Sequence, residues 1–264
     1  MQIFVINLPE SKDRLAFQQS QMERLGLEFE LVRAVSPSHL HNRARHYLSI
    51  GWERPLRKTE IACYLSHHKI WQLIHKRQQP ALILEDDAML SRHVPYLLRQ
   101  LDNYGGCDLV KLEVRGRKKT VGKRGKNILG EYHLLPLYQD SMGAAAYVLW
   151  PSGAEILLEQ ARDNTPGLVD AVISTTYRLN AYQLEPAAAI QLDACEHYGV
   201  GNKIKLSTTI FHEPLPDVSY LTLHERWQFH KRRLLARTRA RMRAMAFRNE
   251  SVTRQIKLDP DDFL

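Results

Sequence analysis

Short apolar runs alternate with amphipathic stretches in the first part of the chain. Residues 2–8 (QIFVINL) and 29–35 (FELVRAV) are rich in β-branched and aromatic side chains, and each run predicts a strand. Between them, Ser11 can cap a helix whose apolar residues fall on roughly one face, and Gly26 can end it. A strand, a helix and a second strand within about 35 residues predict a βαβ unit with parallel strands.

A longer helix and three further strands are predicted downstream. Thr59 can cap a helix over residues 60–77, and the run 81–86 (ALILED) is apolar almost throughout, which is typical of a strand buried on both faces. Residues 108–114 and 143–150 predict two more strands. Helices that alternate with buried strands indicate an α/β domain.

The C-terminal part differs in its charge. The formal net charge of the chain is +8, but residues 225–257 alone hold eleven Lys and Arg against two Glu, so the rest is almost neutral. Within 225–248, apolar side chains fall in a helical stripe about 100° wide with arginines around it. Such a helix suits an anionic membrane surface, although the stripe can equally pack on the rest of the chain. We expect one domain over 1–213 and a basic helical segment over 214–264.

Length and composition limit the class of protein. A chain of 264 residues, 44% of them hydrophobic, can bury the core of one large domain. No signal peptide and no run of about 18 apolar residues is visible, so we expect a cytoplasmic location. The cysteines Cys63, Cys107 and Cys195 form no C-x-x-C pair, which argues against a disulfide framework or a zinc-cysteine site and fits a reducing compartment.

The most informative residues are Glu85, Asp86 and Asp87, which directly follow the apolar run. Ligands of open α/β sheets bind beyond the carboxyl ends of the strands, and three acids there need a cation or hydrogen-bond donors. Oxygen ligands favour Mg²⁺ or Mn²⁺, which can neutralise a diphosphate leaving group. The alternative is a helix N-terminus rich in acids, and the pattern alone leaves both open.

Other polar residues are weaker candidates. In EIACYLSHHKIW (60–71), His67 and Lys69 can reach a phosphate or a sugar hydroxyl if this helix borders a cleft; otherwise the histidine is hydrogen-bonded within the fold. Residues 115–126 hold seven Lys and Arg and three Gly, which fits either a loop closing over phosphates or a solvated hairpin tip. Glu196 and His197 are candidates for a further metal ligand.

Several motifs together resemble glycosyltransferase family 25. They are IFVINLPESKDR, TEIACYLSHHKIW, ALILEDDA, GAAAYVLWPSGAEILL and PGLVDAVIS, in matching order over residues 1–180. The resemblance implies a GT-A-like nucleotide-sugar-binding fold with a mostly parallel central sheet. It also implies an inverting hexosyltransferase that uses a UDP-sugar, with galactose or glucose as the hexose, and Mn²⁺ or Mg²⁺.

The resemblance also implies roles for residues at the donor. Glu85 and Asp87 match the acidic motif that binds the metal and the donor diphosphate, and Asp86 is assigned to the ribose or the sugar. Asn7 and Arg14 match the first strand and turn, where such folds seat the nucleotide.

Three further residues are assigned in the same way. Ser66 and His67 match the family's Ser-His pair near the donor. Asp170 matches its Val-Asp element and is our candidate for the base that takes the proton of the acceptor hydroxyl; a capping or salt-bridging aspartate is the alternative.

The resemblance implies a role in lipopolysaccharide or lipooligosaccharide biosynthesis. The acceptor would be a lipid-linked oligosaccharide, and the enzyme would lie at the inner face of the bacterial inner membrane through residues 225–248. A pI near 9.4 and the Arg-rich helix also allow a nucleic-acid-binding protein, but we expect no nucleic-acid partner because no known module is visible. A metal-dependent phosphohydrolase that uses residues 85–87 is the other alternative.

Overall fold

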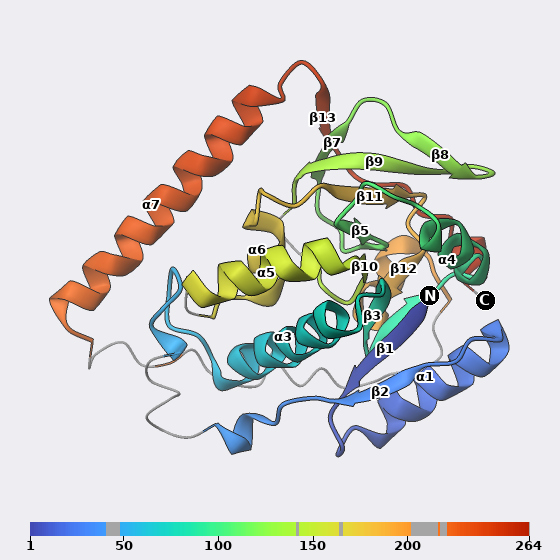
Figure 1. Cartoon of the computed structure of the whole chain (residues 1–264), viewed down its shortest axis with the longest axis horizontal. Helices are drawn as coiled ribbons and strands as arrows, with labels where there is room; N and C mark the ends of the chain where they lie inside the picture. Colours follow the sequence, from blue (N-terminus) through green and yellow to red (C-terminus); the bar gives the residue numbers. More distant parts are fainter. Residues whose placement is uncertain (41–47, 141–142, 164–165, 202–215, 217–220, 264) are drawn as a thin grey trace.

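The computed structural model describes residues 1–40, 48–140, 143–163, 166–201, 216 and 221–263 (Figure 1). Its helices are α1 (Lys12–Leu25), α3 (Lys58–Arg77), α4 (Val94–Asp102), α5 (Pro151–Asp163), α6 (Val169–Thr175) and α7 (Leu223–Ala246). Its strands are β1 (Gln2–Asn7), β2 (Glu30–Arg33), β3 (Ala81–Glu85), β4 (Ala88–Leu90), β5 (Leu109–Lys111), β6 (Glu113–Val114), β7 (Lys119–Gly122), β8 (Lys126–Leu129), β9 (Tyr132–Gln139), β10 (Ala146–Leu149), β11 (Ala181–Glu185), β12 (Ala189–Gln191) and β13 (Ser251–Arg254).

A ten-stranded sheet runs through the molecule in the order β13-β7-β9-β11-β5-β10-β3-β1-β2, and β8 pairs with β9. Parallel pairing of β1 with β2 confirms the βαβ unit, and β3 adds to it in parallel. β9, β10 and β13 run opposite to the other strands, so the sheet is mixed although most of its strands share one direction. The expected parallel arrangement therefore holds around β1 and β3 but not across the whole sheet.

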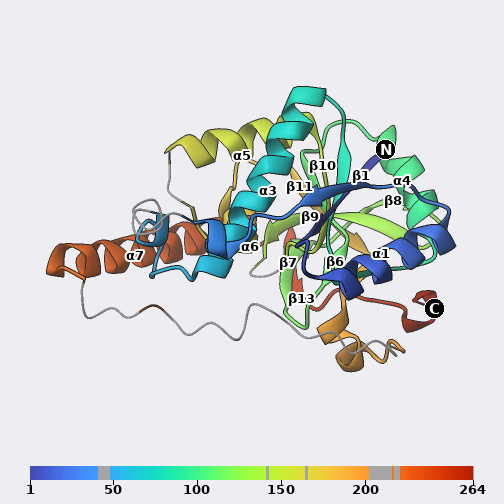
Figure 2. The same cartoon turned by 90° about the horizontal axis from the view of Figure 1, so that it is seen from below.

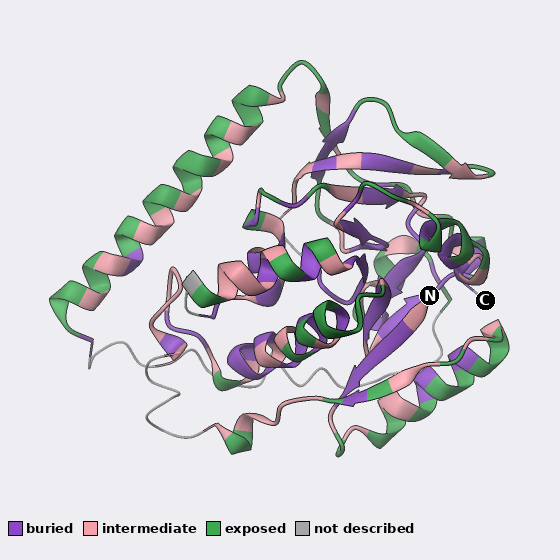
Figure 3. Cartoon of the chain, in the orientation of Figure 1, coloured by how far each residue is buried: buried purple, intermediate pink, exposed green. Residues whose placement is uncertain are grey.

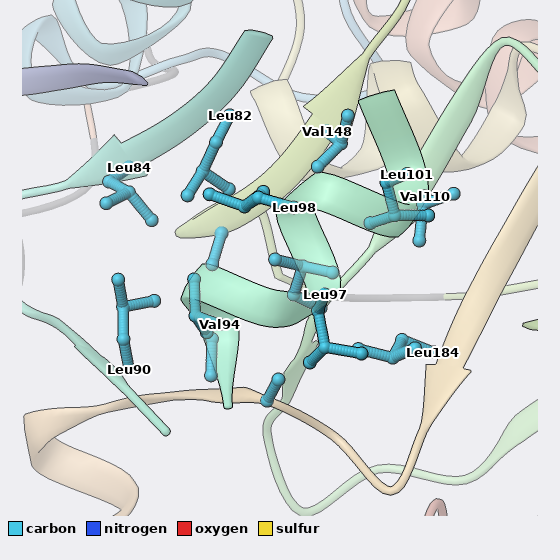
Figure 4. Packing of buried hydrophobic residues seen from close by; sticks show 14 of the residues in the cluster. Leu82, Leu84, Leu90, Val94, Leu97, Leu98, Leu101, Val110, Val148 and Leu184 are labelled. Carbon is cyan, nitrogen blue, oxygen red and sulfur yellow. The ribbon is translucent and has the colours of Figure 1, made fainter. Parts of the chain in front are cut away.

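Apolar layers cover both faces of the sheet. In β3, Leu82 and Leu84 face one layer while Ala81 and Ile83 face the other, which explains why this run is apolar throughout. On the Leu82 side, α4 packs its leucines against β3, β5, β10 and β11 (Figure 4). On the opposite side lie α3, α5 and α6. This sandwich holds the carboxyl ends of β1 and β3 in fixed positions.

Two predicted elements differ in detail from the structure. α3 begins one residue before the expected cap Thr59, because Arg57 is the N-cap and the Glu60 carboxylate accepts its backbone N–H at 2.8 Å. The strand expected over 108–114 is divided between β5 and β6. The division occurs because the carbonyl of Leu112 accepts the N–H groups of Ala188 and Ala189, where β12 begins, and the chain passes into a second, three-stranded sheet of order β4-β12-β6.

The C-terminal segment contains the expected helix and an unexpected strand. α7 confirms the helix, and it lies along one side of the molecule (Figure 2). After it, β13 pairs with β7, so the chain returns to the large sheet and the segment 214–264 is not a separate appendage along its whole length. The boundary expected between 213 and 214 lies outside the described residues.

Candidate active site

A cleft opens beyond the carboxyl ends of β1 and β3, with a cavity volume of about 520 Å³, which is typical of small-molecule sites. Its walls come from the β1–α1 turn, α3, the β3–β4 turn, α6 and the end of β12. The expected site residues that line it are Arg14, Ser66, His67, Glu85, Asp86, Asp87 and Asp170. Asn7 is buried beside them and contacts Asp86. The structure therefore brings all of these residues together.

Glu85 and Asp87 share one neighbour on the cleft side. The amide Nε2 of Gln191, at the end of β12, lies 3.3 Å from Glu85 Oε2 and 3.4 Å from Asp87 Oδ1. Burial, followed by the Glu85 charge, raises the pKa of Asp87 to about 7, so a nearby cation would stabilise the ionised pair. These carboxylates offer the oxygen ligands that Mg²⁺ and Mn²⁺ prefer. The residues present therefore fit a hard divalent cation.

Asp86 has different partners from the two flanking acids. Its Oδ2 accepts from Asn7 Nδ2 at 2.9 Å, and its Oδ1 accepts from Arg14 Nη1 at 2.7 Å. Burial raises the pKa of Asp86, although the bond from Arg14 acts in the opposite direction. The same Arg14 nitrogen lies 3.4 Å from Asp87 Oδ2. The guanidinium therefore compensates part of the negative charge of the cleft.

His67 is fully buried, and both of its ring nitrogens have partners. Trp71 Nε1 donates to the Tyr147 hydroxyl at 2.9 Å, and that hydroxyl lies 2.9 Å from His67 Nδ1. Because an ionised carboxylate can only accept, the contact of Glu85 Oε1 with Nε2 at 3.2 Å places a hydrogen on Nε2, and Nδ1 of the neutral ring then accepts from the Tyr147 hydroxyl. His67 therefore holds the Glu85 carboxylate instead of presenting a free nitrogen to a phosphate.

Cys63 adds a second contact to the same Glu85 oxygen, with Sγ at 3.7 Å. Its sulfur, His67 Nε2 and Glu85 Oε1 lie within 4.8 Å of one another, a spacing that a metal ion can also bridge. Burial, followed by the Glu85 charge, raises the pKa of the thiol well above its usual value. The neutral thiol therefore donates to Glu85, because a metal ligand would have to be a thiolate.

Ser66 connects two elements of the cleft wall. Its hydroxyl donates to the carbonyl of Ala62 and accepts from the N–H of Val35, both at 2.8 Å, so it joins α3 to the chain that follows β2. Lys69, in the same helix, is exposed and does not line the cleft. The sequence-based suggestion that it reaches a phosphate in this site is therefore not supported by its position.

Asp170 lies in the first turn of α6 and lines the cleft. Its Oδ1 accepts the N–H of the next residue, Ala171, at 2.7 Å, but Leu168 is the N-cap of α6, so Asp170 is not the capping residue. Burial raises the pKa of this carboxyl, and the Glu85 charge acts in the same direction. A raised pKa makes the carboxylate a stronger base, so the position and the chemistry suit proton transfer.

Some cleft residues were not found from the sequence. Gln191 is one, and Asp193, which pairs with Arg115 at 2.7 Å, is another. By contrast, Glu196 and His197 do not line the cleft. Glu196 and His197 were suggested only because their side chains can bind metal ions. A single glutamine such as Gln191 stands in no sequence pattern that would suggest a role.

The basic segment 115–126 is neither an open loop nor a hairpin tip over its full length. Residues 119–122 form β7 within the large sheet. Lys119 is buried, donates to Gln183 Oε1 at 2.6 Å and lies 3.1 Å from Asp140 Oδ2. Arg115 is the part of this segment that reaches the cleft.

α7 contacts the rest of the molecule through a face that carries several arginines and the buried Phe229. Arg232 and Arg233 donate to backbone carbonyls of the segment 50–53, and Arg243 donates to the carbonyl of Tyr138. Most of the helix surface is exposed (Figure 3). The large exposed apolar side chains of the helix are Leu223, Trp227, Leu234, Leu235, Met242 and Met245. At about 100° per residue, these point away from the face that contacts the molecule. The alternative in which the stripe packs on the molecule is therefore wrong.

Comparisons with known proteins identify the family. The family model for glycosyltransferase family 25, described as LPS biosynthesis protein, matches residues 1–173. The chain is 29% identical over 174 residues to a glycosyltransferase 25 family member of Anopheles gambiae, and 28% identical over 169 residues to procollagen galactosyltransferase 2 of Homo sapiens. These matches cover 61% and 60% of this chain. The chain belongs to glycosyltransferase family 25.

The relatives differ greatly in length. The chain spans only 28% of the Anopheles protein and 27% of the human one. The lipooligosaccharide biosynthesis protein lic2B of Haemophilus influenzae is 23% identical over 204 residues, which is 71% of this chain and 75% of that protein. Among solved structures, the inositol-1-phosphate CTP transferase of T. maritima covers 73% of this chain and 89% of its own, at 9% identity and a TM-score of 0.40, too low to support an argument. Among the described helices, none is long and apolar enough to cross a bilayer.

Proposed function

We propose that this chain is a metal-dependent, inverting glycosyltransferase of GT-A type that transfers a hexose from a UDP-sugar to a lipopolysaccharide or lipooligosaccharide saccharide. The observation that supports it most is the convergence of Glu85 and Asp87 on one point of a cleft that Asp170 also lines. Family membership favours this function over a nucleic-acid-binding protein or a phosphohydrolase.

The roles of the cleft residues follow from their chemistry. Glu85 and Asp87 would hold the cation, which when bound neutralises the charge of the departing diphosphate. Asp86, held by Asn7 and Arg14, is assigned to the ribose or the donor sugar. Asp170 accepts the proton of the acceptor hydroxyl as that oxygen attacks the anomeric carbon. A single displacement from the face opposite the leaving UDP inverts the anomeric configuration.

The relatives narrow the choice of substrates. One relative is a procollagen galactosyltransferase, which favours galactose over glucose as the hexose. This chain covers 75% of the lic2B protein, a larger share than of the other two relatives. That protein is named for lipooligosaccharide biosynthesis, which favours a lipid-linked oligosaccharide acceptor. Hydrogen bonds to individual sugar hydroxyls would then set the donor preference.

The outward face of α7 suits an anionic membrane surface on the cytoplasmic side, where such an acceptor would be made. Trp227 is 55% exposed and Leu234 is 66% exposed, and arginines surround both. Apolar insertion and attraction of basic side chains to anionic headgroups stabilise the same orientation. The arginines that anchor α7 to the segment 50–53 place it next to Arg54, which lines the cleft.

The experiment that tests the function is a donor screen. The protein is incubated with individual UDP-sugars in Mn²⁺, Mg²⁺ or EDTA, and UDP release is followed with and without truncated lipooligosaccharide. We expect acceptor-dependent UDP release from UDP-galactose that EDTA abolishes, and a product with inverted anomeric configuration by NMR. Release that is unchanged in EDTA would refute metal dependence, and a retained configuration would refute the single displacement.

The membrane proposal is tested separately with vesicles. The protein should sediment with vesicles that contain phosphatidylglycerol and remain in solution with pure phosphatidylcholine. Exchanging Trp227 and Leu234 for alanine should release it, while alanine at Leu31, which is 47% exposed and lies outside α7, should not. Binding that survives the double exchange would contradict the assignment of this face.

A further inference from the structure

Gln191 occupies an unusual position between two acids. It is the last residue of β12, and pairing with β4 places it opposite Ala88, the residue that follows Asp87. The next backbone N–H, of Leu192, donates to the carbonyl of Asp87 at 3.0 Å. The backbone on both sides of the acidic turn therefore fixes where the Gln191 side chain lies.

The amide of Gln191 is only partly satisfied there. The residue is 7% exposed, and its Oε1 is buried and has no hydrogen-bond partner among the described residues. Its Nε2 lies 3.3 Å and 3.4 Å from the two carboxylates, which is long for a bond to a charged acceptor, usually about 2.7–2.9 Å. A buried amide oxygen without a partner is unfavourable, so the orientation with Nε2 toward the acids gains little over the reversed one, in which Oε1 faces them.

We infer that Gln191 is the third protein ligand of the divalent cation, through Oε1, beside Glu85 and Asp87. The inference rests on the metal dependence in the proposed function. A half-turn of the amide exchanges Nε2 and Oε1 and needs no backbone movement. Neighbouring oxygen ligands of Mg²⁺ in octahedral geometry are about 3 Å apart, since each lies about 2.0–2.1 Å from the ion. The observed separations of 3.3 and 3.4 Å are close to that value.

The other polar residues near this point are less suitable. Asp193 is paired with Arg115 at 2.7 Å, and Glu196 and His197 do not line the cleft. Glu85 Oε1 is occupied by His67 and Cys63, which leaves Oε2 on the Gln191 side. An amide oxygen, two carboxylates and water are the ligands that a hard cation prefers.

The test measures Mn²⁺ binding by the full-length protein, with free Mn²⁺ followed by electron paramagnetic resonance in the presence and absence of UDP. Gln191→Leu removes the oxygen and should weaken Mn²⁺ binding at least tenfold. Gln191→Glu keeps an oxygen and adds a charge, so it should bind at least as tightly as the wild type. Gln100→Leu, the same substitution at an exposed site on α4, is the control and should bind unchanged. Circular dichroism and the melting temperature show whether each variant is folded.

The outcomes separate the two proposals. Tight Mn²⁺ binding by folded Gln191→Leu would overturn the role of Gln191 and leave the metal proposal intact. Absence of Mn²⁺ binding by the wild type, even with UDP, would overturn metal dependence and this inference together. A crystal grown with Mn²⁺ and UDP gives the direct readout, because anomalous scattering marks the ion. Oε1 at bonding distance supports the inference, and an ion bound without Oε1 refutes it.

Discussion

Asp140 compensates two buried lysines, and its replacement by asparagine should destabilise the protein strongly. Its Oδ2 lies 2.7 Å from Lys111 Nζ and 3.1 Å from Lys119 Nζ, and the three side chains are at most 3% exposed. Burial opposes ionisation of Asp140, but the two ammonium groups hold its pKa well below the usual value. Asp140→Asn keeps the shape of the side chain and removes the charge that both lysines face.

The magnitude follows from the burial of these charges. Breaking a buried ion pair by removing one partner costs about 3–5 kcal/mol, because the other charge remains buried and uncompensated. Burial lowers the pKa of Lys119, so this lysine can lose its proton in the variant and limit the loss. We therefore expect the free energy of unfolding to fall by about 3 kcal/mol. For a protein of this size that lowers the melting temperature by about 6–12 °C.

Urea unfolding at pH 7 measures the change in the free energy of unfolding, and differential scanning fluorimetry at the same pH measures the change in melting temperature. Asp102→Asn is the matched control, because Asp102 pairs with the N-terminus while 44% exposed, and an exposed pair contributes about 0–1 kcal/mol. The double variant Asp140→Asn, Lys119→Met should be more stable than Asp140→Asn alone, since it removes one uncompensated charge. If Asp140→Asn unfolds like the control, the two lysines do not depend on this carboxylate, and the reasoning fails.

Three further predictions concern carboxyl groups. Asp170→Asn should lower turnover by about 10²–10⁴-fold and leave UDP affinity by calorimetry unchanged; near-normal turnover would exclude it as the base. Asp87→Asn should abolish cation-dependent transfer and yet, in EDTA at pH 8, melt above the wild type, because burial and Glu85 disfavour ionised Asp87. Glu113 is buried, which raises its pKa to about 7 from a usual 4.5, so the folded state keeps a proton that the unfolded state releases. Stability should therefore fall by about 2.5 kcal/mol between pH 5 and pH 8, and Glu113→Gln should flatten that dependence in urea titrations.

The acidic turn could be predicted from the sequence because its signal is local. An apolar run that is buried on both faces and ends in Glu85, Asp86 and Asp87 identifies both the strand and the edge of the sheet where a ligand binds. The contacts of Asp86 with Arg14 and Asn7 span 72 and 79 residues. Only the family resemblance indicated that these residues belong to the same site.

The sequence alone predicted neither the place of Gln191 in the site nor the face of α7 that packs on the molecule. Gln191 comes from a three-residue strand of a second sheet, 104 residues after Asp87, and nothing in its neighbourhood distinguishes it from other glutamines. In α7, the amphipathic pattern predicts the helix but not which face packs. Arg232, Arg233 and Arg243 bind backbone carbonyls of the molecule, so the face with these arginines packs and the apolar stripe on the opposite face stays exposed.

The buried charges around Asp140 also determine the position of the cleft wall. Lys111 Nζ donates to the carbonyl of Gly143, which lines the cleft, at 2.8 Å, and to the Ser174 hydroxyl at 3.3 Å. Ser174 in turn donates to the carbonyl of Asp170 at 2.7 Å. A lysine needs a charged partner when it is this deeply buried, and here the partner is Asp140. The pair of Lys111 with Asp140 therefore stabilises the fold and holds the helix that carries the candidate base, so neither Lys111 nor Asp140 can be exchanged for an apolar residue without moving the site.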